Sequence, residues 1–283
     1  MRLIHSIVIL GGDRRQNYLA GLFEEIGFSV SCCRVPGRSE PEDLSDPLSR
    51  ADLVVLPMPA FDPQKKIRTQ EEGLPLQAVL DTIRPDTVIA GGKLAPGMPL
   101  LSAYQVRCID YAEDESLAIF NAIPSAEGAI QTAMEHTDFT LWSSRVLVIG
   151  FGRIGKALAG RLRSLGAEVT VSARKPADLA AIRTLGFRAE TTGIYADGLP
   201  QYDCIFNTVP APVLFPDHLR EIRPDTCLIE LASSPGGLDP ACGKDERCIP
   251  APALPGRVAP KTAAVFIRDS ILRSLHEQGG FLP

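Results

Sequence analysis

Three glycines at the spacing G-x-G-x-x-G carry the clearest chemical signal in the sequence. An apolar segment, residues 145–149, precedes them, and residues 156–165 after them have the composition of a helix. In such a strand–turn–helix unit the glycines let the backbone approach a pyrophosphate, which the free N–H groups of the helix N-terminus bind. The motif alone would also suit a structural turn, but a second apolar strand at 168–172 completes a βαβ unit. We therefore predict a dinucleotide site at Gly150, Phe151, Gly152, Arg153, Ile154 and Gly155.

The end of the second predicted strand indicates which dinucleotide binds. NAD sites usually carry an Asp or Glu about 20 residues after the glycines, where it accepts hydrogen bonds from the ribose hydroxyls. Residues 169–175 contain no acid, but they include Ser172, Arg174 and Lys175. These side chains suit a 2′-phosphate, because a guanidinium can bind phosphate through two parallel hydrogen bonds. We therefore predict NADP; the alternative is that Arg174 and Lys175 are solvated loop charges.

Turn-forming residues follow two further predicted strands of the same domain. Ligands of open α/β sheets bind beyond the carboxyl ends of the strands. The strand at 203–207 leads into Asn207, Thr208, Val209 and Pro210, which we expect beneath the nicotinamide ribose. The strand at 227–231 leads into a Gly/Pro-rich segment, residues 231–237, that either lines the site or only reverses the chain.

Two other segments carry cations that suit an anionic substrate. After the first predicted strand, two glycines precede Asp13, Arg14, Arg15 and Gln16. Glycines, a helix N-terminus and arginines together suit a carboxylate, although Asp13 as a helix cap with exposed arginines would explain the same residues. The Pro/Gly-rich segment 251–263 holds Arg257 and Lys261 where the last helix begins. A cation there is unfavourable for the helix dipole, which favours a binding role for Lys261.

The alternation of strands and helices predicts two α/β domains, each with a doubly wound parallel sheet. We predict a flavodoxin-like domain over residues 1–122, a connecting helix over 123–138 and a Rossmann domain over 139–260. A separate helix at 114–121 precedes the connecting one. The last helix, 261–283, has one apolar face and is expected to pack back onto the first domain, which would leave a cleft between the domains.

Composition excludes several classes of function. The chain has 283 residues and a net charge of −5, which argues against nucleic acid as the partner. No apolar stretch is long enough to cross a bilayer, and the apolar start, without a cleavage site, is expected to be a strand. The 7 cysteines include no C-x-x-C, which indicates reduced thiols in a cytoplasmic protein. The 4 dispersed histidines give no metal site.

Taken together, these segments resemble the A subunit of dipicolinate synthase over nearly the whole chain. The family's segments G-G-D-x-R-Q, N-x-I-P-x-x-E-G and H-T-D match residues 11–16, 121–128 and 136–138. The most specific match is A-P-x-L-P-G-x-V-A-P-K-T-A at residues 251–263. Two residues depart from the family pattern. Ser234 replaces an Arg in the A-S-x-P-G-G turn, which removes a candidate carboxylate ligand, and Ala253 replaces a Gly.

The resemblance implies an NADP-dependent oxidoreductase that works beside a smaller, flavoprotein-like B subunit of the same synthase. Its reaction would oxidise a dihydrodipicolinate-level intermediate to pyridine-2,6-dicarboxylate in the mother cell of a spore-forming bacterium. The hydride would pass to the cofactor and the proton to a base or to water. To bind the two carboxylates we expect Arg14, Arg15, Gln16, Arg257 and Lys261. As catalytic residues we expect Asp13, Glu127, His136 and Lys261.

Two other functions stay open at this point. The chain could be a different NADP-linked enzyme, of the alanine dehydrogenase or shikimate dehydrogenase type, which a substrate panel would distinguish. It could instead be a nucleotide-binding subunit that supports a catalytic flavoprotein without catalysing a step itself. Whether the chain forms a homodimer is also left open by the sequence.

Overall fold

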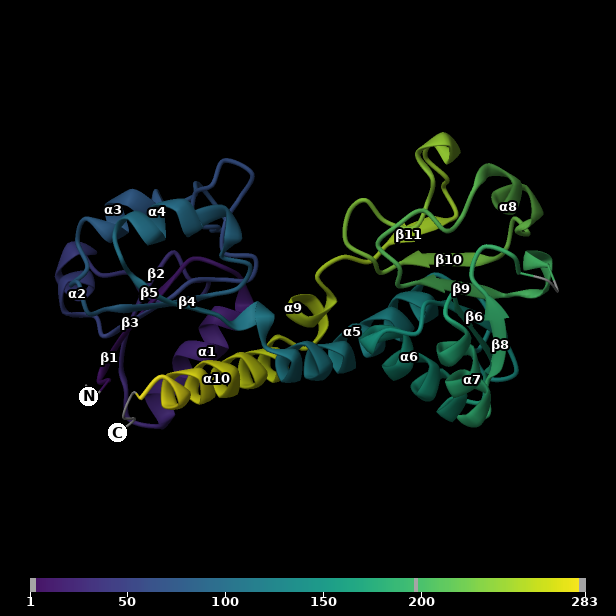
Figure 1. Cartoon of the computed structure of the whole chain (residues 1–283), viewed down its shortest axis with the longest axis horizontal. Coiled ribbons are helices and arrows are strands. Elements are labelled where there is room, and N and C mark those ends of the chain that lie inside the picture. The colour runs from purple at the N-terminus through teal and green to yellow at the C-terminus, as the bar shows by residue number, and fades with distance from the viewer. Residues whose placement is uncertain (1–3, 196–197, 280–283) are drawn as a thin grey trace. The chain divides into compact units, whose positions relative to one another are not determined.

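The chain divides into two compact units in the computed structural model, which describes residues 4–195 and 198–279. One unit consists of Met1–Asn121 together with Ala259–Pro283, and the other of Ala122–Val258. Each unit has its own parallel sheet (Figure 1). Each also has its own clusters of buried hydrophobic side chains. Both sheets are wound in two directions from an inner strand, which confirms the predicted fold class.

The first unit contains a five-stranded parallel sheet in the order β2-β1-β3-β4-β5. This is the strand order of flavodoxin-like folds. The three inner strands are buried along almost their whole length, as is typical of a parallel sheet with helices on both faces. The strands are β1 (Ser6–Leu10), β2 (Ser29–Cys33), β3 (Leu53–Val55), β4 (Val88–Gly91) and β5 (Arg107–Asp110).

Two long helices of the first unit, α1 (Arg14–Glu25) and α10 (Pro260–Glu277), lie side by side (Figure 1). Ile267 and Ile271 of α10 are buried in the same core cluster as Phe23 of α1. This shared apolar face explains why the end of the chain belongs to the same unit as its beginning. The remaining helices of this unit are α2 (Ser45–Arg50), α3 (Leu76–Leu80), η1 (Ala95–Gly97), α4 (Met98–Ala103) and η2 (Tyr111–Glu113).

The helix α5 (Glu115–Glu135) carries the chain from the first unit into the second without a break. The helix therefore starts earlier than the connecting helix predicted at 123–138, and it includes the segment predicted as a separate helix. Pro124 lies inside it, where the missing N–H leaves one helical hydrogen bond unmade. Ala126 and Ala129, just beyond the proline, are fully buried, and this packing stabilises the continuous helix.

The second unit contains a six-stranded parallel sheet in the order β11-β10-β9-β6-β7-β8. Its first strand, β6, lies inside the sheet, and the chain continues to β7 on one side and later to β9 on the other. This is the Rossmann order, in which the ligand site lies at the point where the strand order reverses. The strands are β6 (Arg145–Ile149), β7 (Glu168–Ala173), β8 (Arg188–Thr191), β9 (Cys204–Asn207), β10 (Cys227–Glu230) and β11 (Cys248–Pro250).

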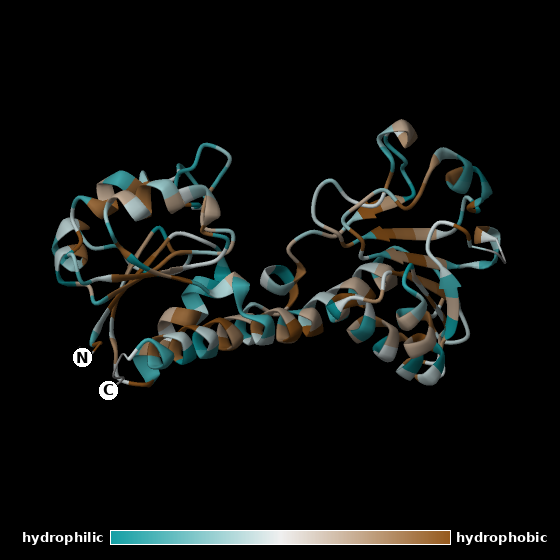
Figure 2. Ribbon diagram, viewed as in Figure 1, coloured by the Kyte–Doolittle hydropathy of each residue, from teal (hydrophilic) through white to brown (hydrophobic). Residues whose placement is uncertain are grey.

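Most strands of the second unit are coloured as hydrophobic, except the polar edge strand β8, and its helices carry a mixture of hydrophobic and hydrophilic residues (Figure 2). The helices are α6 (Arg153–Ser164), α7 (Pro176–Thr184), η3 (Leu199–Gln201), α8 (Pro216–Glu221), η4 (Pro240–Cys242) and α9 (Leu254–Val258). Among the described residues of the chain, no helix is long and apolar enough to cross a membrane.

Candidate functional site

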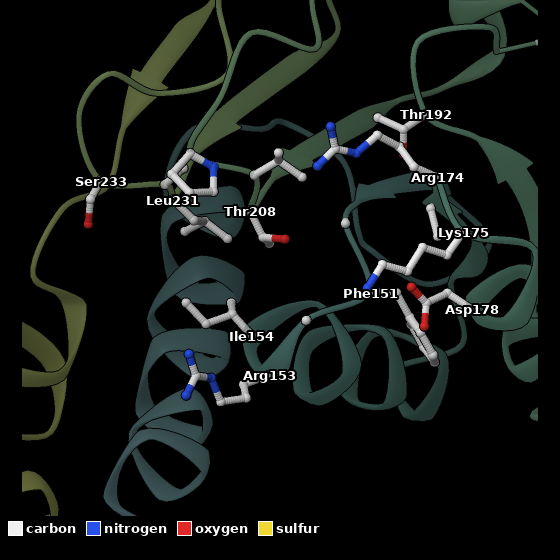
Figure 3. A pocket seen from close by; sticks show the side chains of 16 residues that line it. Phe151, Arg153, Ile154, Arg174, Lys175, Asp178, Thr192, Thr208, Leu231 and Ser233 are labelled. Carbon is white, nitrogen blue, oxygen red and sulfur yellow. The ribbon is translucent and has the colours of Figure 1, made fainter. Parts of the chain in front are cut away.

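A pocket of about 560 Å³ opens at the carboxyl ends of the strands of the second unit. It lies where the strand order reverses, between β6 and β9. Residues 150–154, 174–175 and 208–210, all predicted to bind the cofactor, line it (Figure 3). Residues 231–233, which follow β10, complete the opposite wall. The pocket therefore brings together segments that are far apart in the sequence.

The glycine loop has the geometry of a pyrophosphate cradle. Gly150 has φ +104°, and a Cβ on it would lie 2.4 Å from the Thr208 hydroxyl oxygen. A Cβ on Gly155 would lie 2.1 Å from the carbonyl oxygen of Gly150, so the helix can approach the strand only because this residue is glycine. By contrast, a Cβ on Gly152 would meet no protein atom within 4 Å. Gly152 is the N-cap of α6, whose first N–H groups have no side-chain cap. The open space and uncapped N–H groups fit a dinucleotide pyrophosphate.

Arg174 and Lys175 enter the pocket from the end of β7 (Figure 3). Both are exposed, and neither forms a hydrogen bond through its side chain or an ion pair with a described residue. Asp178, in the first turn of α7, also lines the pocket (Figure 3). The pocket therefore presents two cations and one acid where the adenosine ribose of a dinucleotide binds.

Three residues predicted to contact the cofactor, Gly155, Ser172 and Asn207, do not line the pocket. Ser172 is fully buried, and its hydroxyl accepts a hydrogen bond from the Thr192 hydroxyl at 2.9 Å. Thr192, just after β8, lines the pocket in its place. Asn207 is fully buried, and its amide donates to the carboxylate of Glu230. Because strand side chains alternate between faces, a residue at a strand end can point into the core rather than to the ligand.

Asp13, Arg15 and Gln16 in the first unit form a closed local network. Asp13 caps α1, and its carboxylate binds Nε and Nη2 of Arg15 at 2.9 Å each. Arg15 is buried, and its Nη2 also donates to the carbonyl oxygen of Met58 at 2.8 Å. Gln16 is fully buried and accepts the Asp13 N–H at 2.9 Å. Much of the Arg15 guanidinium is thus already bound within the protein, which the prediction of a substrate-binding Arg15 did not anticipate.

The pKa of the Asp13 carboxyl reflects this network. Burial raises it, but hydrogen bonds and the positive charge of Arg15 outweigh burial and hold the pKa below its usual value. A lowered folded-state pKa stabilises the fold above the unfolded pKa of about 3.9, and the contribution is lost as the pH falls through the folded pKa.

We therefore expect Asp13→Asn, which keeps the helix cap, to lower the unfolding temperature by a few degrees at pH 7. The difference from the unmodified protein should shrink as the pH falls below about 4, because protonation of the Asp13 carboxyl then favours the unfolded state and finally removes the same charge from the folded protein. Thermal unfolding across this range checks the expectation. A difference that stays constant with pH would show that the ion pair does not stabilise the first unit.

The other predicted substrate and catalytic residues are divided between the units. Arg14 and Lys261 belong to the first unit and Arg257 to the second; all three are exposed and form no ion pair with a described residue. Glu127 lies on α5, 3.4 Å from Nε of Arg161, in a separate groove of about 480 Å³.

His136 follows α5 and is exposed, and its Nδ1 lies 2.8 Å from the carbonyl oxygen of Thr132. Neither Glu127 nor His136 lines the dinucleotide pocket. No cluster of three or more potential metal ligands occurs among the described residues.

The sequence analysis missed two polar residues that line the pocket, Asp178 and Thr192. Asp178 could have been found, because the first turn of a helix that begins at Pro176 must lie close to the carboxyl end of the preceding strand. Thr192 could not, because the strand before it, β8, has a polar sequence and carries no clear period.

Comparison with known proteins agrees with this geometry. Over 285 residues the chain is 32% identical to the dipicolinate synthase A subunit of Bacillus subtilis strain 168, and the match covers 96% of each chain. The chain belongs to the dipicolinate synthase A-subunit family. This confirms the resemblance drawn from the sequence motifs, and membership of a subunit family implies a partner subunit. Residues 6–112 match the model of the N-terminal domain of the dipicolinate synthase A subunit.

Residues 123–232 match the NAD binding domain of D-isomer specific 2-hydroxyacid dehydrogenases. A nicotinamide dinucleotide is therefore the cofactor, and this chain is an oxidoreductase subunit.

Solved structures of the same family have the same fold. The dipicolinate synthase A subunit of Bacillus halodurans is 29% identical, with a TM-score of 0.84 and coverage of 97% of this chain and 99% of that one. Its counterpart from Bacillus subtilis is 30% identical, with a TM-score of 0.82 and coverage of 98% and 97%. A transhydrogenase from Sinorhizobium meliloti, 15% identical with a TM-score of 0.68 over 96% and 93% of the chains, shares the fold alone.

Proposed function

We propose that this dipicolinate synthase subunit uses NADP to oxidise a dihydrodipicolinate-level intermediate to pyridine-2,6-dicarboxylate. The proposal of NADP rather than NAD rests on Arg174 and Lys175. Both are cations that line the pocket and have no partner among the described residues. Unpaired cations at the ribose end of a dinucleotide pocket suit a 2′-phosphate. Asp178 is the one acid in this part of the described lining, and its charge favours the opposite choice.

The reaction removes a hydride and a proton from a dihydropyridine and leaves an aromatic ring. When bound, the cofactor supplies a hydride acceptor. The chain's own residues hold the pyrophosphate through the N–H groups at the start of α6 and orient the substrate through its carboxylates. For the carboxylates we propose Arg14, Lys261 and Arg257, because their charges are not already neutralised; Arg15 and Gln16 then support the segment that carries Arg14.

The proton passes to water or to a basic side chain, for which Asp13, Glu127, His136 and Lys261 are proposed. Asp13 is ionised at neutral pH, since Arg15 holds its pKa low, and it is correspondingly a weak base. We further propose that a flavoprotein-like B subunit works beside this one, in the mother cell of a spore-forming bacterium. The family's name supports this setting, as sporulation produces dipicolinate.

A pair of opposite charge changes tests the choice of cofactor. Arg174→Ala should weaken NADP binding by roughly tenfold or more and leave NAD binding unchanged, because a charge-assisted phosphate contact is worth about 1.5–3 kcal/mol. Asp178→Asn should tighten NADP binding, because it removes a negative charge near the 2′-phosphate. Calorimetric titration of both dinucleotides into each variant gives the four affinities.

Arg183→Ala is the matched control, because Arg183 lies at the other end of the same helix, α7, and does not line the pocket. Equal affinity of the unmodified protein for NAD and NADP would contradict the proposal. So would a loss of NAD binding in Asp178→Asn, which would make that carboxylate the acceptor for the ribose hydroxyls.

A further inference from the structure

We propose that Glu230, the last residue of β10, is a positioning residue that shapes the pocket wall for the nicotinamide half of the dinucleotide. The inference rests on the dinucleotide pocket described above and goes beyond the cofactor choice proposed for it. Glu230 does not line the pocket itself. Its carboxylate instead binds the two segments that do, one after β9 and one after β10.

The Glu230 carboxylate accepts hydrogen bonds on both of its oxygens. Oε1 accepts from the Asn207 side-chain amide and from the Ala232 backbone N–H, both at 2.8 Å. Oε2 accepts from the same amide at 3.0 Å and from the Gly237 backbone N–H at 2.8 Å. Every one of these contacts needs a hydrogen-bond acceptor on residue 230. An ionised carboxylate accepts on both of its oxygens, whereas a neutral amide accepts only on its single oxygen.

The first segment held in this way is the one after β9. The Asn207 amide that Glu230 binds also donates to the carbonyl oxygen of Val209 at 3.0 Å, and its Oδ1 accepts the Val209 N–H at 3.1 Å. Val209 and its neighbour Thr208 line the pocket. These contacts connect Glu230 through Asn207 to the backbone of Val209 and so fix this part of the pocket wall. Asn207, which was predicted as a cofactor ligand, thus contacts the protein's own backbone.

The second segment is the turn after β10. Ala232 and Gly237 lie at its two ends, so two hydrogen bonds to one carboxylate close the turn. A Cβ on Gly237 would lie 2.1 Å from the Asn207 amide nitrogen, so the turn can pack on Asn207 only with glycine there. Ala232 and Ser233 of this turn line the pocket. The half-buried carboxylate of Glu230 thus fixes two neighbouring loops.

These loops face the nicotinamide half for a geometric reason. Leu231 and Ser233 lie across the pocket from Arg174 and Lys175 (Figure 3). The adenosine ribose lies at the end of β7 and the pyrophosphate lies over the glycine loop, so the remaining half of the dinucleotide extends to the opposite wall. Glu230 should therefore matter for the whole dinucleotide and not for its adenosine half.

The test compares the whole dinucleotide with its adenosine half. In Glu230→Gln the new amide N–H₂ faces backbone N–H groups, so one of the two loops loses its acceptor. We expect affinity for NADP to fall about tenfold, since contacts to a charged group are lost, while affinity for 2′,5′-ADP stays unchanged. Glu230→Asp keeps the charge but is one methylene shorter, and should give a smaller loss in the same direction. Calorimetry measures both ligands in both variants.

Asp239→Asn is the matched control. Asp239 also accepts a backbone N–H, from Ala241 at 2.9 Å, in the same connection after β10, and it does not line the pocket. This variant should bind both ligands normally. Thermal unfolding identifies a variant that is not folded, and if Glu230→Gln fails to fold, Glu230→Asp provides the comparison.

Equal losses for NADP and 2′,5′-ADP would overturn the proposal, because they would make Glu230 a residue of general stability. No loss for NADP in either folded variant would overturn it as well. If the unmodified protein binds NAD in preference to NADP, the proposed cofactor choice fails. The same comparison with NAD and 5′-ADP then decides the role of Glu230 independently.

Discussion

Replacing Gly152 with valine is expected to abolish dinucleotide binding and to leave the fold intact. The new side chain would enter open space, since nothing in the protein lies within 4 Å of a Cβ at this position, so the protein has no internal reason to rearrange. It would occupy the place where the pyrophosphate meets the N–H groups of α6. Losing two such charge-assisted hydrogen bonds, at about 1.5–3 kcal/mol each, weakens binding on the order of a hundredfold or more.

Calorimetric titration with NADP, beside a thermal unfolding curve, measures both parts of this expectation. Gly160→Val is a matched control, because Gly160 lies in the same helix, also faces open space and does not line the pocket. It should bind NADP normally. Retained NADP affinity in Gly152→Val would show that the glycine loop is a structural turn and not a phosphate cradle.

The second large effect is expected at Arg14 and Lys261, two exposed cations of the first unit that form no ion pair with a described residue. Lys261→Ala and Arg14→Ala should each lower kcat/KM by roughly ten- to a hundredfold and leave NADP affinity unchanged, because each leaves a substrate carboxylate without a charged partner. Arg15 is a poorer choice for this test. It is buried and paired with Asp13, so Arg15→Ala would also destabilise the unit.

Steady-state kinetics of both variants, reconstituted with the partner subunit, gives the comparison. Arg268→Ala serves as the control on the same helix as Lys261, because Arg268 is paired with its neighbour Asp269. The variants should also lose the preference for pyridine-2,6-dicarboxylate over its mono-acid analogue in inhibition assays. Near-normal kcat/KM in both Lys261→Ala and Arg14→Ala would make these cations solvated surface charges.

The dinucleotide loop was predictable because its signal is local. An apolar strand, three glycines and a helix follow one another within a few residues. At Gly150 and Gly155 the structure leaves no room for a Cβ, which explains why glycine is needed there. The parallel sheets were predictable for a similar reason, since short buried strands alternate with helices along the chain. Arg174 and Lys175 line the pocket, and the sequence could indicate their position because they directly follow a strand whose end is recognisable.

Other features of the site and the fold could not be predicted, because they depend on contacts between residues that are distant in the sequence. Ser172 and Asn207 lie at strand ends, but the direction of each side chain is set by partners on other strands or loops, namely Thr192 and Glu230. The position of Glu230 was treated only as part of a strand, although its carboxylate binds two loops. The continuity of α5 through Pro124 likewise depends on apolar packing that outweighs a local helix breaker.

The most direct test of the proposed function is reconstitution of the oxidation reaction. The purified chain is mixed with its flavoprotein-like partner, NADP and freshly prepared dihydrodipicolinate, and the ultraviolet absorbance of NADPH is followed beside the formation of pyridine-2,6-dicarboxylate. We predict one NADPH for each dicarboxylate formed, and loss of both in Gly152→Val. Dicarboxylate formation that proceeds without NADPH, or unchanged in Gly152→Val, would contradict the proposal that this subunit carries the hydride acceptor.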